Sequence, residues 1–142
     1  MKGTQTEVGL KELFMANSED HLLLLFSSEK LEELNKKEEA KMLREKALVE
    51  LGHARGILEK MIKYMGVESI REWLSEIKNK KAENVRDEFT LTSTIYLLSK
   101  LLSEKVSDEK EKEELTKQAD EYYQKAKGAY ERILESNVSL TK

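Results

Sequence analysis

Apolar residues recur at alternating steps of three and four positions along most of this chain. The clearest set is Leu115, Ala119, Tyr122, Ala126, Ala129 and Ile133. A second set is Ala40, Leu43, Ala47, Leu51, Ala54, Leu58, Met61 and Met65. This spacing places each set on one face of an α-helix. No proline occurs among the 142 residues, so the strongest helix-breaking signal is absent. The pattern predicts an all-α protein.

The N-terminal part of the chain is predicted to form two short helices. The first covers residues 6–16 and ends at Asn17 and Ser18. Ser18 then caps a second segment over residues 19–26, because a serine hydroxyl can accept hydrogen bonds from the first N–H groups of a helix. Four consecutive leucines make this second segment apolar on every side, which is typical of a helix that is buried on several faces or contacts a partner.

A long third helix is expected over residues 29–65, capped by Ser27 and Ser28. Its apolar pattern thins between Leu34 and Ala40. The sequence leaves open whether the helix bends, breaks or projects from the body at this point.

Gly66 marks the predicted end of the long helix, because helices often end with a glycine in the left-handed conformation. Residues 69–72 read Ser-Ile-Arg-Glu, a capping box that would open the next helix. The buried face of that helix would consist of Ile70, Trp73, Leu74 and Ile77.

The C-terminal half contains another apolar set, which ends near Val106. This set includes Val85, Phe89, Leu91, Ile95, Leu98 and Leu102. No apolar residue follows until Leu115, which indicates a chain reversal with Ser107 or Asp108 as the next N-cap. One continuous helix over residues 84–135 is the alternative, but it would be about 80 Å long and unsupported.

The expected architecture is a single-domain helical bundle over residues 1–142. It has five or six helices, and three long, mainly antiparallel helices form its frame. Residues 1–5 and 136–142 are expected to be frayed tails, since termini without tertiary contacts are poorly ordered.

Composition narrows the classes of function and location. The charges nearly balance, with 25 basic and 28 acidic residues and a net charge of −3, whereas proteins that bind nucleic acid broadly usually have a basic excess. The chain has no cysteine, and its longest fully apolar run, Leu22 to Phe26, is too short to span a membrane. Its opening residues lack an apolar core, so we expect no secretory signal. We therefore expect a cytoplasmic protein that does not contact membranes. Its Glu and Lys enrichment is also typical of thermophilic proteins.

Candidate catalytic and metal-binding motifs are weak. Glu50 and His53 match the Glu-x-x-His motif of di-iron bundles, which need a second copy and two further carboxylates. The only other histidine, His21, has Ser18 three residues before it, so the second copy is missing. We expect no metal, no cofactor and no enzymatic activity. Gly52 and Gly56 are expected to allow close packing against Trp73 or another large side chain, or a local bend.

An apolar surplus near the N-terminus predicts a protein interface. Its residues are Phe14, Met15, Leu22, Leu23, Leu24, Leu25 and Phe26. They offer more apolar faces than one groove within a bundle takes up, and surplus apolar surface marks interfaces. We therefore expect a non-enzymatic interaction or scaffolding subunit that self-associates; its protein partners are not identified by the sequence.

The alternative is a helical accessory subunit of a nucleoprotein complex. A local cluster of basic residues, Lys78, Lys80, Lys81 and Arg86, could contact nucleic-acid phosphates. The same lysines also suit the negative end of a helix dipole without any ligand. Nucleic-acid binding is therefore not the favoured hypothesis.

Overall fold

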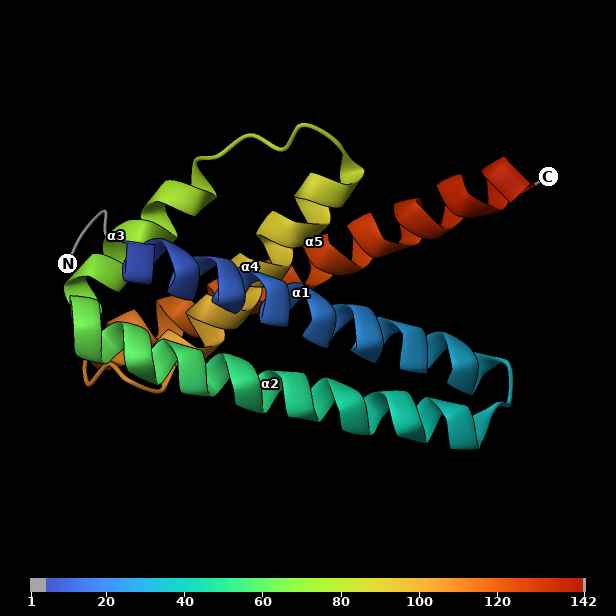
Figure 1. The fold of residues 1–142 in the computed structure, drawn as a ribbon, viewed down its shortest axis with the longest axis horizontal. Coiled ribbons are helices and arrows are strands. Elements are labelled where there is room, and N and C mark those ends of the chain that lie inside the picture. Colours follow the sequence, from blue (N-terminus) through green and yellow to red (C-terminus); the bar gives the residue numbers. More distant parts are fainter. Residues whose placement is uncertain (1–4, 142) are drawn as a thin grey trace. The chain divides into compact units, whose positions relative to one another are not determined.

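The computed structural model describes the backbone of residues 5–141 and the side chains of residues 5–136. This part of the chain forms five α-helices and no strand (Figure 1). They are α1 (Gln5–Glu33), α2 (Lys37–Met65), α3 (Val67–Lys78), α4 (Val85–Ser103) and α5 (Glu109–Thr141). The predicted all-α helical bundle is confirmed. The chain divides into two compact units, Met1–Ile70 and Arg71–Lys142, and each is described by itself.

Helix α1 is continuous, so the predicted break at Asn17 and Ser18 is wrong. The Ser18 hydroxyl donates a hydrogen bond to the Phe14 carbonyl at 2.7 Å. Ser28 likewise donates to the Leu25 carbonyl at 2.6 Å, instead of capping a new helix. A serine that bonds the carbonyl one turn earlier is accommodated inside a helix, which explains why neither site interrupts α1.

The break in the predicted long helix lies at Asn35. Asn35 has a positive φ of 62°. Its N–H donates to the Glu32 carbonyl at 3.0 Å, and the next N–H, of Lys36, donates to the Leu31 carbonyl at 2.9 Å. These are the two hydrogen bonds of a Schellman motif, in which Asn is the usual substitute for Gly. The motif ends α1 and turns the chain into α2.

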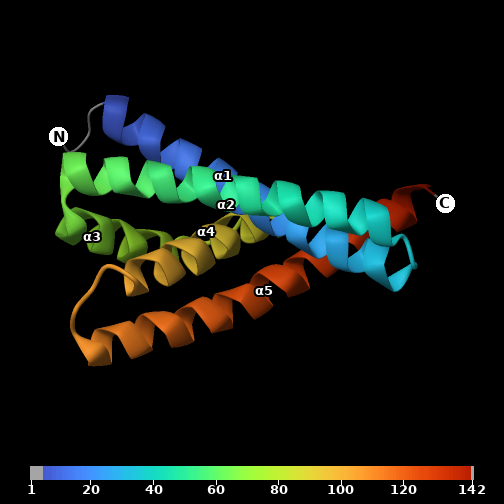
Figure 2. The same ribbon diagram turned by 90° about the horizontal axis from the view of Figure 1, so that it is seen from below.

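Helices α1 and α2 form an antiparallel hairpin, which is visible in both ribbon views (Figures 1 and 2). The buried face of α2 carries Ala40, Ala47 and Ala54 at seven-residue spacing. Small side chains let two helix backbones approach closely. The approach allows the buried His21 ring to contact the Ala47 carbonyl through Nδ1 at 2.6 Å. A carbonyl oxygen only accepts, so Nδ1 is the donor in this contact.

Gly66 is the only residue between α2 and α3. Its N–H donates to the Ile62 carbonyl at 2.9 Å and its carbonyl accepts from Ile70 at 3.4 Å. Its φ of 83° and ψ of 157° belong to a region that is essentially restricted to glycine. The boundary was therefore predicted correctly, but α3 begins at Val67 and the predicted capping box lies inside the helix. The predicted face of α3 is buried, as expected: Ile70, Trp73, Leu74 and Ile77.

Helix α4 begins at a well-formed cap. The Asn84 side chain accepts from the Asp87 N–H at 2.8 Å, while Asp87 accepts from the Glu83 N–H at 2.9 Å. Most of α4 is buried, which agrees with a helix that is apolar on most sides. Every member of its predicted apolar set except Val85 is in the core.

Helices α4 and α5 form a second antiparallel hairpin, so the predicted chain reversal is confirmed and the single long helix is excluded. Asp108 caps α5 by accepting from the Glu111 N–H at 3.1 Å. Paired contacts run in opposite directions along the two helices. The ring centroids of Phe89 and Tyr130 lie 6.3 Å apart, those of Tyr96 and Tyr123 lie 5.3 Å apart, and Gln118 donates to Ser99 at 2.8 Å.

The seam of α5 is buried as predicted at Ala119, Ala126 and Ala129. The helix itself is longer than predicted, because it continues past Glu135 to Thr141. Its first turns are tied to α3 by a bidentate ion pair, in which Arg71 Nε and Nη2 donate to the Glu111 carboxylate at 2.7 and 2.9 Å. The expected N-terminal tail lies, apart from Gln5, outside the described residues.

Candidate protein-interaction surface

The structure divides the seven predicted interface residues between core and surface. Phe14, Leu22 and Phe26 are fully buried and belong to the core. Met15, Leu24 and Leu25 are half-buried, and Leu23 is 39% exposed. Consecutive residues of a helix point about 100° apart, so a run of leucines necessarily places some side chains inside and others outside.

A groove lies between α1 and α2 on one side of the hairpin. Leu23 and Leu24 of α1 and Val49 of α2 supply its apolar wall. Asp20, Lys46 and Glu50 supply the polar rim. Its volume is about 420 Å³. An apolar centre with a charged rim is the usual composition of a protein-contact site.

A second groove of about 390 Å³ lies on the other side of the same hairpin. It is lined by His21 and Leu25 from α1 and by Lys41, Arg44, Glu45, Ala47 and Leu48 from α2. His21 and its hydrogen-bond partner Ala47 thus both line this groove. The two grooves flank α2 along its solvent-facing side.

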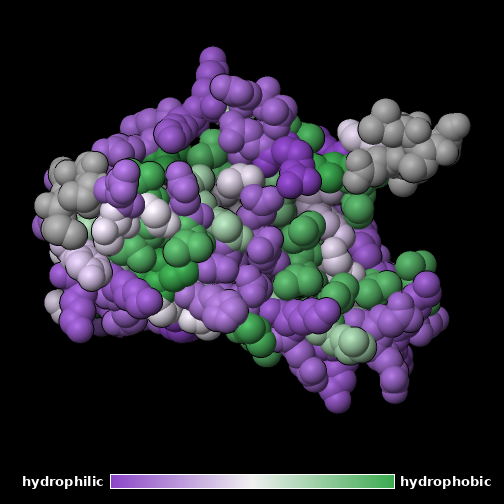
Figure 3. All heavy atoms as spheres, in the orientation of Figure 1, coloured by the Kyte–Doolittle hydropathy of each residue, from purple (hydrophilic) through white to green (hydrophobic). Residues whose placement is uncertain are grey.

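Among the side chains that the structure describes, the strongly exposed large hydrophobic ones all lie in the first unit. They are Val8, Leu13, Leu23, Leu34, Met42, Leu48, Val49 and Tyr64. Figure 3 shows hydrophobic patches between hydrophilic side chains over the hairpin. Single exposed apolar residues are ordinary, but a concentration on one hairpin indicates an interaction surface.

Sequence analysis missed Met42, Leu48 and Val49, which contribute to this surface. The signal was available, because Met42, Leu48 and Val49 all fall outside the periodic apolar set of α2. An apolar residue that is out of phase with the buried face points to solvent.

Gly52 and Gly56 lie on the exposed side of α2. A methyl group built on either glycine meets nothing within 4 Å. The predicted close packing against Trp73 or another large side chain is therefore wrong. The space beside both glycines is open.

Glu50 and His53 contact each other, with His53 Nδ1 3.2 Å from the Glu50 carboxylate. His53 is exposed, whereas His21 is buried at the α1–α2 contact. Within the described residues, no group of three or more His, Cys, Asp or Glu side chains is placed to hold a metal ion. The two histidines thus do not come together in one site.

The predicted phosphate-contacting residues lie around the loop between α3 and α4. Lys78 ends α3, Lys80 and Lys81 are in the loop, Arg86 is in the first turn of α4, and all four are exposed. The same segment carries Glu83, Asp87 and Glu88. Acidic groups interspersed in this way reduce the positive potential that a phosphate backbone would meet.

No family model, curated protein or solved structure matches this chain. Among the described residues, no helix has the combined length and apolarity needed to cross a membrane.

Proposed function

We propose that this protein is a non-enzymatic interaction subunit that self-associates through the α1–α2 hairpin. The observation that carries the proposal is the concentration of exposed hydrophobic side chains on this hairpin, from Val8 to Tyr64. Burying such side chains against another protein is favourable by about 25 cal/mol per Å² of apolar surface. The mixed charges around both grooves supply the polar rim of such a contact.

A nucleic-acid-binding accessory role is the second hypothesis, and it ranks below the first. Lys78, Lys80 and Lys81 are exposed and lie close together in the chain. Their acidic neighbours and the net charge of −3 favour a solvated helix end over a phosphate site.

Sedimentation of purified full-length protein tests the proposal. We expect a concentration-dependent dimer or larger species, and Leu23→Glu should shift it toward the monomer by placing a charge in the apolar groove. Because Leu23 is already 39% exposed, the variant should keep its helical circular-dichroism spectrum. Thr116→Glu, at an exposed site of α5, is the matched control and should leave the distribution unchanged. A monomer at every concentration would contradict self-association.

A further inference from the structure

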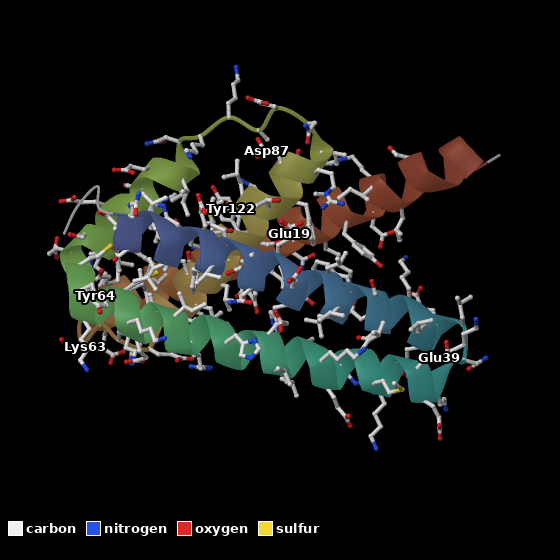
Figure 4. The ribbon with its side chains drawn as sticks, in the orientation of Figure 1. Glu19, Glu39, Lys63, Tyr64, Asp87 and Tyr122 are labelled. Atoms are coloured by element: carbon white, nitrogen blue, oxygen red, sulfur yellow. The ribbon has the colours of Figure 1, made fainter. Side chains whose placement is uncertain are left out.

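The middle of the solvent-facing side of α2 has an ordered charge distribution, which exposed Lys41, Lys46 and Glu59 flank. One row of exposed residues follows the three- and four-residue steps of a single helix face, opposite the buried alanines. This outer face consists of Glu38, Met42, Glu45, Val49, Gly52, Gly56, Lys60 and Lys63. Its acidic residues all lie toward the N-terminus of α2 and its basic residues toward the C-terminus. Figure 4 labels Lys63, at the basic end of this face, and Glu39, which follows Glu38 near the N-terminal end of α2.

We propose that α2 packs antiparallel against α2 of a second copy of this chain, about a two-fold axis between Gly52 and His53. This inference rests on the proposed self-association and specifies its geometry. A two-fold contact uses the same surface on both copies, so each residue meets its counterpart across the axis. Glu45 then lies beside Lys60 of the second copy, and the reciprocal pair forms on the other side of the axis.

The shape of the outer face fits the same axis. Val49 is 55% exposed, and the two-fold axis sets it opposite Gly56 of the second copy. The open space at Gly52 and Gly56 gives the valine a place to seat and lets the two helix backbones approach closely. Met42 lies beside Lys63 of the second copy, whose aliphatic stem can cover it.

The charges decide between this arrangement and a parallel one. A parallel pair would place Glu45 beside Glu45 and Lys60 beside Lys60, and like charges across an interface are unfavourable. Parallel packing would also align the two helix dipoles unfavourably, whereas antiparallel packing opposes them. The charges of the outer face are thus complementary to those of a second copy only when the two α2 helices are antiparallel.

The two exposed glycines support an intermolecular role. Each is a poorer helix former than alanine, and neither packs against a neighbour within its own unit. A close contact with a second helix gives them a function that the isolated hairpin does not.

Charge exchange tests the proposal directly. Glu45→Lys should raise the dimer dissociation constant at least about tenfold, since the two-fold axis repeats each repulsion. Lys60→Glu should do the same, and the double variant Glu45→Lys/Lys60→Glu should return to within about threefold of wild type. The matched control Glu83→Lys changes the same charge at an exposed loop site of the second unit and should have little effect. Failure of the double variant to recover would overturn the antiparallel pairing.

Glycine substitution separates association from folding. Gly56→Leu should raise the melting temperature of the monomer, because leucine is a better helix former and the site is open, yet it should weaken the dimer. Gly9→Leu is the matched control in α1, where space is also open, and it should leave the dimer intact. A dimer unaffected by Gly56→Leu would overturn this inference while leaving self-association in place; a monomeric wild type would overturn both.

Cross-linking tests the direction of packing, because the chain contains no cysteine of its own. His53→Cys lies next to the proposed axis and should form a disulfide-linked dimer on mild oxidation. Met42→Cys should not form one, because an antiparallel pair places the two residues at position 42 about 30 Å apart along the helices. This distance is far beyond the reach of a disulfide. Rapid cross-linking of Met42→Cys with none for His53→Cys would indicate another geometry.

Discussion

At the scale of single residues, two backbone positions with positive φ determine how the first unit turns. Asn35 ends α1 in a Schellman motif, and Gly66 joins α2 directly to α3. Asn35 lies in the left-handed region of backbone conformation, which asparagine tolerates. The conformation of Gly66 lies outside what any side chain adopts at low cost, so this position depends on glycine alone.

Gly66→Ala is therefore expected to destabilise the protein by about 1–3 kcal/mol, although its side chain would meet no neighbour. Denaturant unfolding followed by circular dichroism measures the change. Gly128→Ala is the control, because that glycine is helical and its added methyl group would be 4.0 Å from the Arg132 side chain. It should stabilise the protein by up to about 1 kcal/mol. Equal effects at both positions would contradict the role given to the backbone of Gly66.

At the scale of helices, small residues define the contact between α4 and α5. Ala126 is fully buried, whereas its neighbour Lys125 is 51% exposed and pairs with Glu121 at 3.2 Å. Replacing either alanine or lysine by leucine changes the intrinsic helix propensity only slightly. Packing alone distinguishes them.

Ala126→Leu should cost about 1–3 kcal/mol, because the added atoms enter a close helix contact. Lys125→Leu should cost little, since it removes only an exposed ion pair and a contact with the Tyr122 ring. Thermal melts of the two variants measure the contrast. If both shift equally and slightly, the α4–α5 seam has been misassigned.

At the scale of the whole molecule, charge is balanced along the chain while exposed apolar surface is not. The net charge is −3, but the strongly exposed hydrophobic side chains, among those described, belong to the first unit. Balanced charge provides no general attraction for nucleic acid. These two observations support the proposed association through the hairpin over nucleic-acid binding.

Reversal of Lys78, Lys80 and Lys81 to Glu should change stability by no more than about 0.5 kcal/mol, as is usual for exposed sites. Gel-shift assays at low salt should show no appreciable binding of RNA or DNA by the wild-type protein. Tight binding that decreases with salt and disappears in the triple variant would reverse the order of the two functional hypotheses, because counterion release has this signature.

The sequence alone determined which positions of most helices are buried. The set around Trp73 in α3 is buried throughout, and so are the sets around Leu98 in α4 and Ala126 in α5 apart from half-buried members at Val85, Leu115, Tyr122 and Ile133. The spacing of apolar residues on one face depends only on the local geometry of a helix. The buried face can therefore be predicted without knowing which elements cover it. Gly66 and Asp108 were also predictable, because cap residues act within one turn.

Tertiary structure decided whether Ser18, Ser28 and Asn35 lie within a helix or between two helices. It also decided which apolar side chains remain exposed. Ser18 can cap a helix or bond the carbonyl one turn earlier, and in the structure, where α1 packs along α2, it bonds the Phe14 carbonyl within a continuous helix. Likewise, nothing in the leucine run distinguishes buried Leu22 from exposed Leu23. Burial is a property of the neighbour that covers a side chain, and for the leucine run of α1 that neighbour is α2, which His21 contacts at Ala47, 26 residues away along the chain.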